Sequence, residues 1–157
     1  MEERYHAGPG FTVVSGGQTG ADRAGLDWAI AHGLRHGGWC PSGRPSEDGV
    51  VPDRYALQET PGSGYLQRTK WNVRDRDATL IFTLDEQLDG GSARTAKIAV
   101  KLGKPWLHVR PGVNPKYVAS FLALHHVKTL NVAGKRASVA PGIEELVHAV
   151  LSQSVRI

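Results

Sequence analysis

The chain has 157 residues, a hydrophobic fraction of 40% and a formal net charge of +4. This length suits one domain that buries roughly two-thirds of its unfolded surface, and no apolar run approaches the ~20 residues that a membrane span needs. The start lacks a secretory signal, Cys40 is the only cysteine, and the seven histidines show no metal-ligand spacing. We therefore expect a cytoplasmic protein without a membrane partner or a structural metal, with a flexible segment at 1–10 and one domain at 11–157.

Strand and helix patterns alternate along the chain. The expected strands cover about 12–15, a short stretch ending at residue 40, 78–83, 105–109 and 127–132; the expected helices cover about 19–32, 65–76, about 92–103, 115–125 and 141–152. This alternation predicts an α/β fold, Rossmann-like and doubly wound, with a mainly parallel sheet of about five strands and helices on both faces. Ligands bind such sheets at the carboxyl ends of the strands.

A glycine-rich turn, Ser15-Gly16-Gly17-Gln18-Thr19-Gly20-Ala21-Asp22, follows the first strand. Glycine lets the backbone approach a ligand, and the free N–H groups at a helix start favour an anion. The expected ligand-binding residues here are Gly16, Gly17, Gln18, Thr19 and Gly20. The spacing differs from G-x-G-x-x-G, and the Gly-Lys-Ser/Thr of a P-loop is absent. For Thr19 and Asp22, a capping box is an equal alternative to ligand contact.

The segment from Pro41 to Gly64 is longer than most unstructured connections, which are usually lids or binding loops beyond ~12 to 15 residues. It leaves the second strand on the ligand side. Arg44, Glu47 and Asp48 combine a fixed positive charge with carboxylates and are expected to contact a polar ligand. The alternative is a solvated loop whose charges pair with one another.

The following helix begins at the same end of the sheet. Arg68 and Asn72 share one of its faces because they are four residues apart, and both are expected to bind the ligand. Cys40 closes a strand nearby, but no neighbouring base activates it, so we assign it to the core.

A second glycine turn, Asp89-Gly90-Gly91-Ser92-Ala93-Arg94-Thr95, follows the strand 78–83. Its first helical turn contains no acid that would compete with a bound anion. Gly90, Gly91, Ser92 and Thr95 are therefore expected to hold a phosphate. Ser92 has the alternative role of a helix N-cap.

Positive charge is concentrated in the second half of the chain, where residues 91–157 carry ten Lys and Arg against two Asp and Glu. Lys97, Lys101 and Lys104 follow one helix toward its C-terminus, where they oppose the helix dipole. Aromatic residues do not interleave with the basic ones as a single-strand binding surface requires. We therefore do not expect nucleic acid as a partner.

Taken in order, several segments resemble the molybdenum carrier protein family, a branch of the Rossmann-like SLOG superfamily. The segments that carry the resemblance are Ser15 to Asp22, Gly38-Trp39-Cys40-Pro41-Ser42-Gly43-Arg44, Glu47-Asp48-Gly49, Arg68-Thr69, Asn72-Val73, Thr79 to Phe82, Gly90-Gly91-Ser92, and Leu130 to Gly134 with Ser138 and Pro141-Gly142-Ile143. The chain departs from the family pattern at Lys135 and Ala137, where the family usually has a proline and an acidic residue.

The resemblance implies a carrier of molybdenum cofactor, a phosphorylated pterin, that forms a homo-oligomer, either dimer or tetramer. The superfamily also includes lonely-guy phosphoribohydrolases, whose Pro-Gly-Gly-x-Gly-Thr-x-x-Glu motif ends in a glutamate that this chain lacks after Thr95. We therefore expect a binding protein for a phosphorylated pterin or nucleotide, with molybdenum cofactor as the leading ligand and no assigned catalytic residue. The alternative is an enzyme that cleaves a nucleotide N-glycosidic bond, using Glu47 or Asp48.

Overall fold

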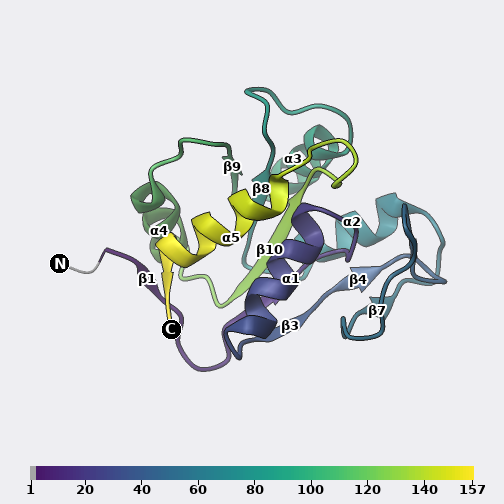
Figure 1. Cartoon of the computed structure of the whole chain (residues 1–157), viewed down its shortest axis with the longest axis horizontal. Coiled ribbons are helices and arrows are strands. Elements are labelled where there is room, and N and C mark those ends of the chain that lie inside the picture. The colour runs from purple at the N-terminus through teal and green to yellow at the C-terminus, as the bar shows by residue number, and fades with distance from the viewer. Residues whose placement is uncertain (1–2) are drawn as a thin grey trace.

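The computed structural model describes residues 3–157. Across these residues a five-stranded parallel sheet has the order β3 (Arg35–Gly37), β2 (Thr12–Val14), β10 (Thr129–Gly134), β8 (Ala78–Phe82) and β9 (Trp106–Val109) (Figure 1). The helices are α1 (Ala21–Ala31), α2 (Tyr65–Arg74), α3 (Gly90–Leu102), α4 (Pro115–Leu124) and α5 (Ile143–Ser154). The predicted Rossmann-like α/β fold is confirmed.

The last long strand lies at the centre of the sheet. In β10, Leu130 pairs with Val13 of β2 on one side and with Ala78 of β8 on the other. Because all three strands are parallel, their carboxyl ends meet at one edge of the sheet. The loops that follow β2, β8 and β10 therefore converge, although they are far apart in the sequence.

The two faces of the sheet are packed differently. In β8, Leu80 and Phe82 join the main hydrophobic core with side chains of α1, α4 and α5, while Thr79 and Ile81 alternate toward the opposite face. That face is covered by α3, which contacts β8 and β10, and α2 packs against α3. The same face carries a buried polar pair, in which the Asn131 amide donates to Thr79 Oγ1 over 3.2 Å. Burial of each large apolar side chain contributes about 1.5 to 3 kcal/mol to folding.

The long segment between Pro41 and Gly64 is partly ordered by short strands. Within it, β5 (Pro45–Ser46) and β6 (Gly49–Val50) form an antiparallel pair, and β7 (Gln58–Glu59) pairs in parallel with β4 (Trp39–Cys40). A second, smaller hydrophobic cluster fastens the segment to α1; its members are Leu26, Val51, Tyr55 and Leu57.

The two ends of the described chain lie together, away from the converging loops (Figure 1). β1 (Tyr5–His6) pairs in parallel with β11 (Val155–Arg156), and Tyr5 Oη donates to the Val127 carbonyl over 2.7 Å. The segment 1–10 that the sequence predicts to be flexible thus contains a paired strand; residues 1–2 lie outside the described part of the chain.

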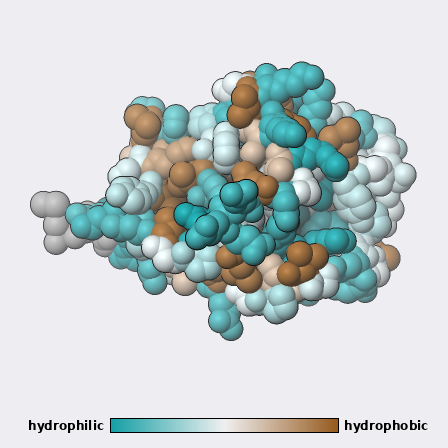
Figure 2. All heavy atoms as spheres, turned by 90° about the horizontal axis from the view of Figure 1, so that it is seen from above, coloured by the Kyte–Doolittle hydropathy of each residue, from teal (hydrophilic) through white to brown (hydrophobic). Residues whose placement is uncertain are grey.

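The surface seen from above in Figure 2 is largely hydrophilic, and its hydrophobic residues form several separate groups. No helix formed by residues 3–157 is both long and apolar enough to cross a membrane.

Candidate functional site

A pocket of about 390 Å³ lies where the loops after β2, β8 and β10 converge. Its walls come from the starts of α1, α2 and α3 and from the loop after β10. The lining residues are Gln18, Asp22, Tyr65, Arg68, Thr69, Gly90, Gly91, Ser92, Arg94, Thr95, Ala133, Gly134, Lys135, Arg136 and Val139. The pocket thus occupies the carboxyl edge of the sheet, where the sequence predicts a ligand.

The second glycine turn forms one wall of the pocket. Asp89 occupies the N-cap position of α3 without a side-chain capping bond, and the first turn of the helix contains no acid. Ser92 is therefore not the N-cap. Its hydroxyl is buried and has no hydrogen-bond partner among residues 3–157, whereas Thr95 Oγ1 donates to the Gly91 carbonyl over 2.9 Å. Unpaired backbone N–H groups and an unused hydroxyl make this wall suited to an anion.

Asp22 and Arg68 meet on another wall of the pocket. Arg68 Nη1 lies 3.4 Å from Asp22 Oδ2, and the Gln18 N–H donates to the same oxygen over 3.2 Å. Burial raises the pKa of the Asp22 carboxyl above its ordinary value, and the nearby Arg68 charge opposes that rise. Arg68 Nε is buried and has no partner within the described chain. This guanidinium therefore has a donor available for a ligand.

Three further basic residues line the pocket: Arg94, Lys135 and Arg136. The Lys135 ammonium pairs with the Asp89 carboxylate, so that the loop after β10 is tied to the start of α3. Together with Arg68, these side chains outnumber Asp22, which is the one carboxylate that residues 3–157 contribute to the lining. A surplus of positive charge in a concave site attracts anions.

The first glycine turn contributes Gln18 and Asp22 to the pocket lining but neither Thr19 nor the glycines. Gly17 and Gly20 serve close packing: a Cβ would come within 2.4 Å of Leu57 Cδ1 at Gly17 and within 2.4 Å of the Lys135 carbonyl oxygen at Gly20, where φ is +84°. Gly20 is the N-cap of α1 and no side chain caps the helix, so Thr19 makes no capping bond. The Gly16 Cα instead faces the Arg68 guanidinium.

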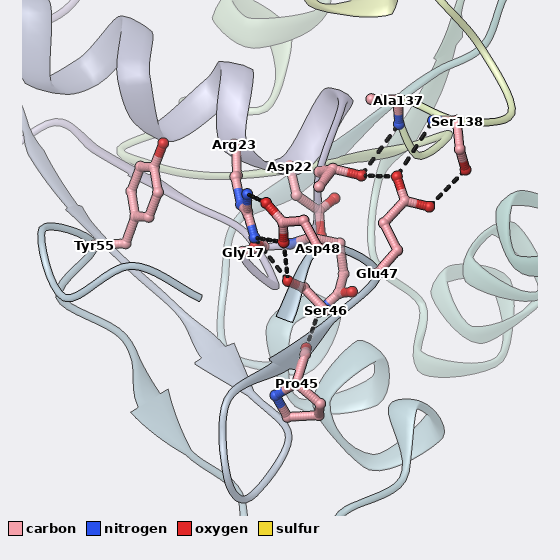
Figure 3. A network of polar contacts seen from close by, with 12 residues as sticks. Gly17, Asp22, Arg23, Pro45, Ser46, Glu47, Asp48, Tyr55, Ala137 and Ser138 are labelled. Atoms are coloured by element: carbon pink, nitrogen blue, oxygen red, sulfur yellow. Dashed lines mark hydrogen bonds and ion pairs between the residues drawn. The ribbon is translucent and has the colours of Figure 1, made fainter. Parts of the chain in front are cut away.

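Two carboxylates of the long segment are bound to other parts of the chain, Glu47 to residues of two loops and Asp48 to Arg23 of α1 (Figure 3). Glu47 accepts hydrogen bonds from Thr19 Oγ1 and Ser138 Oγ, each over 2.5 Å, while Asp48 pairs with Arg23 at 2.6 Å. These bonds lower the pKa of Glu47 and hold the pKa of Asp48 well below its usual range. Neither carboxylate lines the pocket.

Arg44 and Asn72 also lie outside the lining. Arg44 has a positive φ of 56° and its guanidinium donates to the carbonyls of Pro52 and Tyr55, each over 2.9 Å. Asn72 is buried and forms two hydrogen bonds with the backbone of Trp39, which fix β4 against α2. In the structure, Arg44 therefore bonds within the long segment, and Asn72 joins α2 to β4.

Of the predicted ligand-binding residues, the structure brings six together in the pocket: Gln18, Arg68, Gly90, Gly91, Ser92 and Thr95. Eight do not line it: Gly16, Gly17, Thr19, Gly20, Arg44, Glu47, Asp48 and Asn72. The sequence did not predict that the loop after β10 forms a wall of the pocket. β10 is the last long strand along the chain, but it lies at the centre of the sheet. A signal was present, since Gly134 ends the strand and is followed at once by Lys135 and Arg136.

A comparison with protein families matches residues 13–155 to the circularly permutated YpsA SLOG family. The chain belongs to this family. The family description agrees with the sheet order, because the strand that comes last among the long strands lies at the centre.

Cys40 is fully buried, and burial raises the pKa of its thiol.

Among solved structures, a putative molybdenum carrier protein from Syntrophus aciditrophicus SB superposes with a TM-score of 0.86. The two sequences are 44% identical, and the alignment covers 91% of this chain and 93% of that one. A diphosphate reductase of the non-mevalonate pathway aligns at a TM-score of 0.42 and 14% identity, over 92% of this chain and 60% of that one, which is too low to support an argument. No curated protein matches the chain.

No group of three or more His, Cys, Asp or Glu side chains suited to a metal ion occurs within residues 3–157.

Proposed function

We propose that the protein binds a small phosphorylated ligand, a pterin or a nucleotide, with molybdenum cofactor as the leading candidate. One observation carries the proposal: the uncapped start of α3 and the unpartnered Ser92 hydroxyl line the same pocket as Arg68. Helix N-terminal N–H groups and a guanidinium are the usual donors for phosphate. The similarity to a putative molybdenum carrier protein supports the choice of ligand.

The alternative function, cleavage of a nucleotide N-glycosidic bond, has less support. Its proposed carboxylates, Glu47 and Asp48, are already paired with Ser138, Thr19 and Arg23 and do not line the pocket. A general acid or base must lie within hydrogen-bonding reach of the reacting group. We therefore propose a carrier and not a hydrolase, and include in the proposal the homo-oligomer that the resemblance implies.

The test begins with the ligand that accompanies the purified protein. Denaturation followed by mass spectrometry and pterin fluorescence should release a phosphorylated pterin or a nucleotide, and a Ser92→Ala, Arg68→Ala double variant should release much less. A Lys97→Ala variant serves as a matched control because Lys97 is an exposed cation of α3 outside the pocket. A folded protein that carries no ligand, and that binds neither phosphorylated pterins nor nucleotides in calorimetry, would overturn the proposal.

The carrier and hydrolase hypotheses are then separated by incubation with nucleoside monophosphates. A carrier should return them unchanged, whereas a hydrolase should release free base and ribose 5-phosphate. Light scattering on the same preparation measures the mass of the particle, and a monomer would contradict the homo-oligomer.

A further inference from the structure

The pocket contains one feature that a simple phosphate site does not explain. Asp22 is the one carboxylate that the described part of the chain contributes to its lining, and its side chain is only 5% exposed. A carboxylate repels a phosphate, and burying it costs free energy unless donors surround it. Part of that cost is offset by the Gln18 N–H and the Arg68 guanidinium, which approach Oδ2, and by the Gly16 backbone N–H, which also donates to the carboxylate. A carboxylate can accept about four hydrogen bonds, so these three contacts leave capacity for a ligand donor.

Asp22 and Ser92 lie on different sides of the central strand. Asp22 opens α1 after β2, Ser92 opens α3 after β8, and β10 lies between β2 and β8. Neighbouring strands are about 4.8 Å apart, so β2 and β8, which lead into these two helices, are separated by roughly 10 Å. A phosphate held at α3 therefore leaves the rest of its molecule to cross Ala133 and Gly134 toward Asp22.

The contact between Arg68 and Asp22 can be exchanged. At 3.4 Å it is longer than a charge-assisted hydrogen bond of ordinary length, and Arg68 Nε has no partner within the described chain. A ligand N–H that replaces Arg68 at Asp22 would leave the guanidinium free to bind the phosphate. Tyr65 also lines the pocket, is 46% exposed and lies beside Arg68, with 5.5 Å between the guanidinium carbon and the ring centre. Its ring offers an apolar surface to a planar group.

We propose that Asp22 determines ligand specificity by accepting hydrogen bonds from a ring edge that carries an amino group next to a ring N–H. Pterins (2-amino-4-oxo, with N3–H) and guanine (2-amino-6-oxo, with N1–H) share this edge, and adenine, cytosine and hypoxanthine lack it. The proposal rests on the proposed function, because it assumes that the phosphate of the ligand lies at the start of α3. It narrows the ligand class to phosphorylated pterins and guanine nucleotides.

Two matched pairs of ligands test the assignment. GMP is compared with IMP, and neopterin monophosphate with the lumazine analogue in which an oxygen replaces the amino group. Each pair differs at the edge that Asp22 would contact and shares its phosphate. Calorimetry on the full chain should show that the amino member of at least one pair binds about tenfold or more tightly, as expected for a charge-assisted hydrogen bond. The pair with the tighter amino member identifies the source as pterin or guanine nucleotide.

The variant Asp22→Asn keeps the size of the side chain and removes its charge. It should reduce the preference for the amino member to nearly one, while the affinity for the member without the amino group changes little. Asp53→Asn is the matched control, because Asp53 is exposed on the long segment and does not line the pocket. If Asp22→Asn fails to fold, Asp22→Glu, which keeps the charge and moves the carboxylate by one methylene group, is measured in its place and should likewise lose the preference.

The outcomes separate this inference from the proposed function. Equal binding of both members of each pair by the wild-type protein would overturn the role of Asp22 and leave a phosphate site intact. A preference that survives in folded Asp22→Asn would likewise assign the ring edge to another residue. Failure of all four ligands to bind would overturn this inference, and the proposed function would fall with it only if no other phosphorylated pterin or nucleotide binds either.

Discussion

The Arg68 guanidinium lies against the Cα of Gly16: a Cβ added at Gly16 would stand 2.2 Å from Arg68 Nη1. Gly16 lies outside the pocket lining, yet it leaves the space through which Arg68 reaches Asp22. A residue of the first glycine turn therefore acts on the pocket through a side chain of α2.

We predict that Gly16→Ala weakens ligand binding about tenfold with little change in folding stability. The added methyl group displaces the flexible end of Arg68, and a lost charge-assisted hydrogen bond costs about 1.5 to 3 kcal/mol. Calorimetric titration with GMP or a phosphorylated pterin measures the loss. Gly64→Ala is the control, since a Cβ there meets no atom within 4 Å of it. Equal affinities of the two variants would show that the position of Arg68 is unimportant.

Gly91→Val should abolish binding while the fold survives. A Cβ at Gly91 meets no protein atom within 4 Å, so the protein can accept the new side chain, which would then occupy the space beside the α3 N–H groups. The measurement is phosphate or phosphorylated-pterin affinity, with circular dichroism as the test of folding. Unchanged affinity in a folded variant would mean that the anion does not lie at the start of α3.

Arg44→Ala is expected to lower the stability of the protein first. Its guanidinium joins the carbonyls of Pro52 and Tyr55, and hydrogen bonds to charged groups contribute about 1.5 to 3 kcal/mol when one partner is removed. Urea denaturation should show a loss of about 2 kcal/mol. A variant with parental stability but tenfold weaker ligand binding would instead support direct contact between Arg44 and the ligand.

Acid should weaken the attachment of the long segment through Asp48. Hydrogen bonds from Arg23 and Ser46 hold the pKa of Asp48 well below its usual range, so the folded pKa is lower than the unfolded value of about 3.9. The resulting stability is present above pH 4 and is lost as the pH falls below it. Thermal denaturation between pH 6 and pH 3 should show a smaller decline in Tm for Asp48→Asn than for Asp53→Asn. Equal declines in Tm for the two variants would show that Asp48 does not cause the loss of stability in acid.

Cys40 should be inert in the folded protein. The residue is fully buried, and burial raises the pKa of its thiol, which keeps it protonated at neutral pH. A thiol reagent should therefore react only after denaturant is added, and Cys40→Ser should keep ligand binding while losing about 1 to 3 kcal/mol of stability for the buried hydroxyl. Loss of bound molybdenum or of turnover in a folded Cys40→Ser protein would place the thiol in the site.

Local patterns located most of the secondary structure. The strand predicted at 78–83 is β8 (Ala78–Phe82), and the helix predicted at 115–125 is α4 (Pro115–Leu124), because a short apolar run and an Asn-Pro helix start are local signals. The strand predicted at 127–132 lies two residues later, at Thr129–Gly134. Strand ends depend on pairing, and β10 continues as far as its partner β8 does.

The directions in which charged side chains point were harder to predict. The sequence predicts that Arg44 and Arg68 both face the ligand, since each stands near the carboxyl edge of the sheet. Arg68 lines the pocket, whereas Arg44 turns back to bind the carbonyls of its own loop. Nothing in the local sequence separates the two, because the choice depends on which carbonyls a folded loop leaves unpaired.

The sequence by itself determined the α/β alternation and the acid-free glycine turn at Gly90-Gly91-Ser92. Both are local properties, set by hydrophobic period and by backbone freedom over a few residues. Only the tertiary structure decided that Gly134, Lys135 and Arg136 form a third wall and that Asp22 faces the pocket. Those positions follow from the insertion of β10 between β2 and β8, a pairing between segments more than forty residues apart, which residue spacing along the chain does not encode.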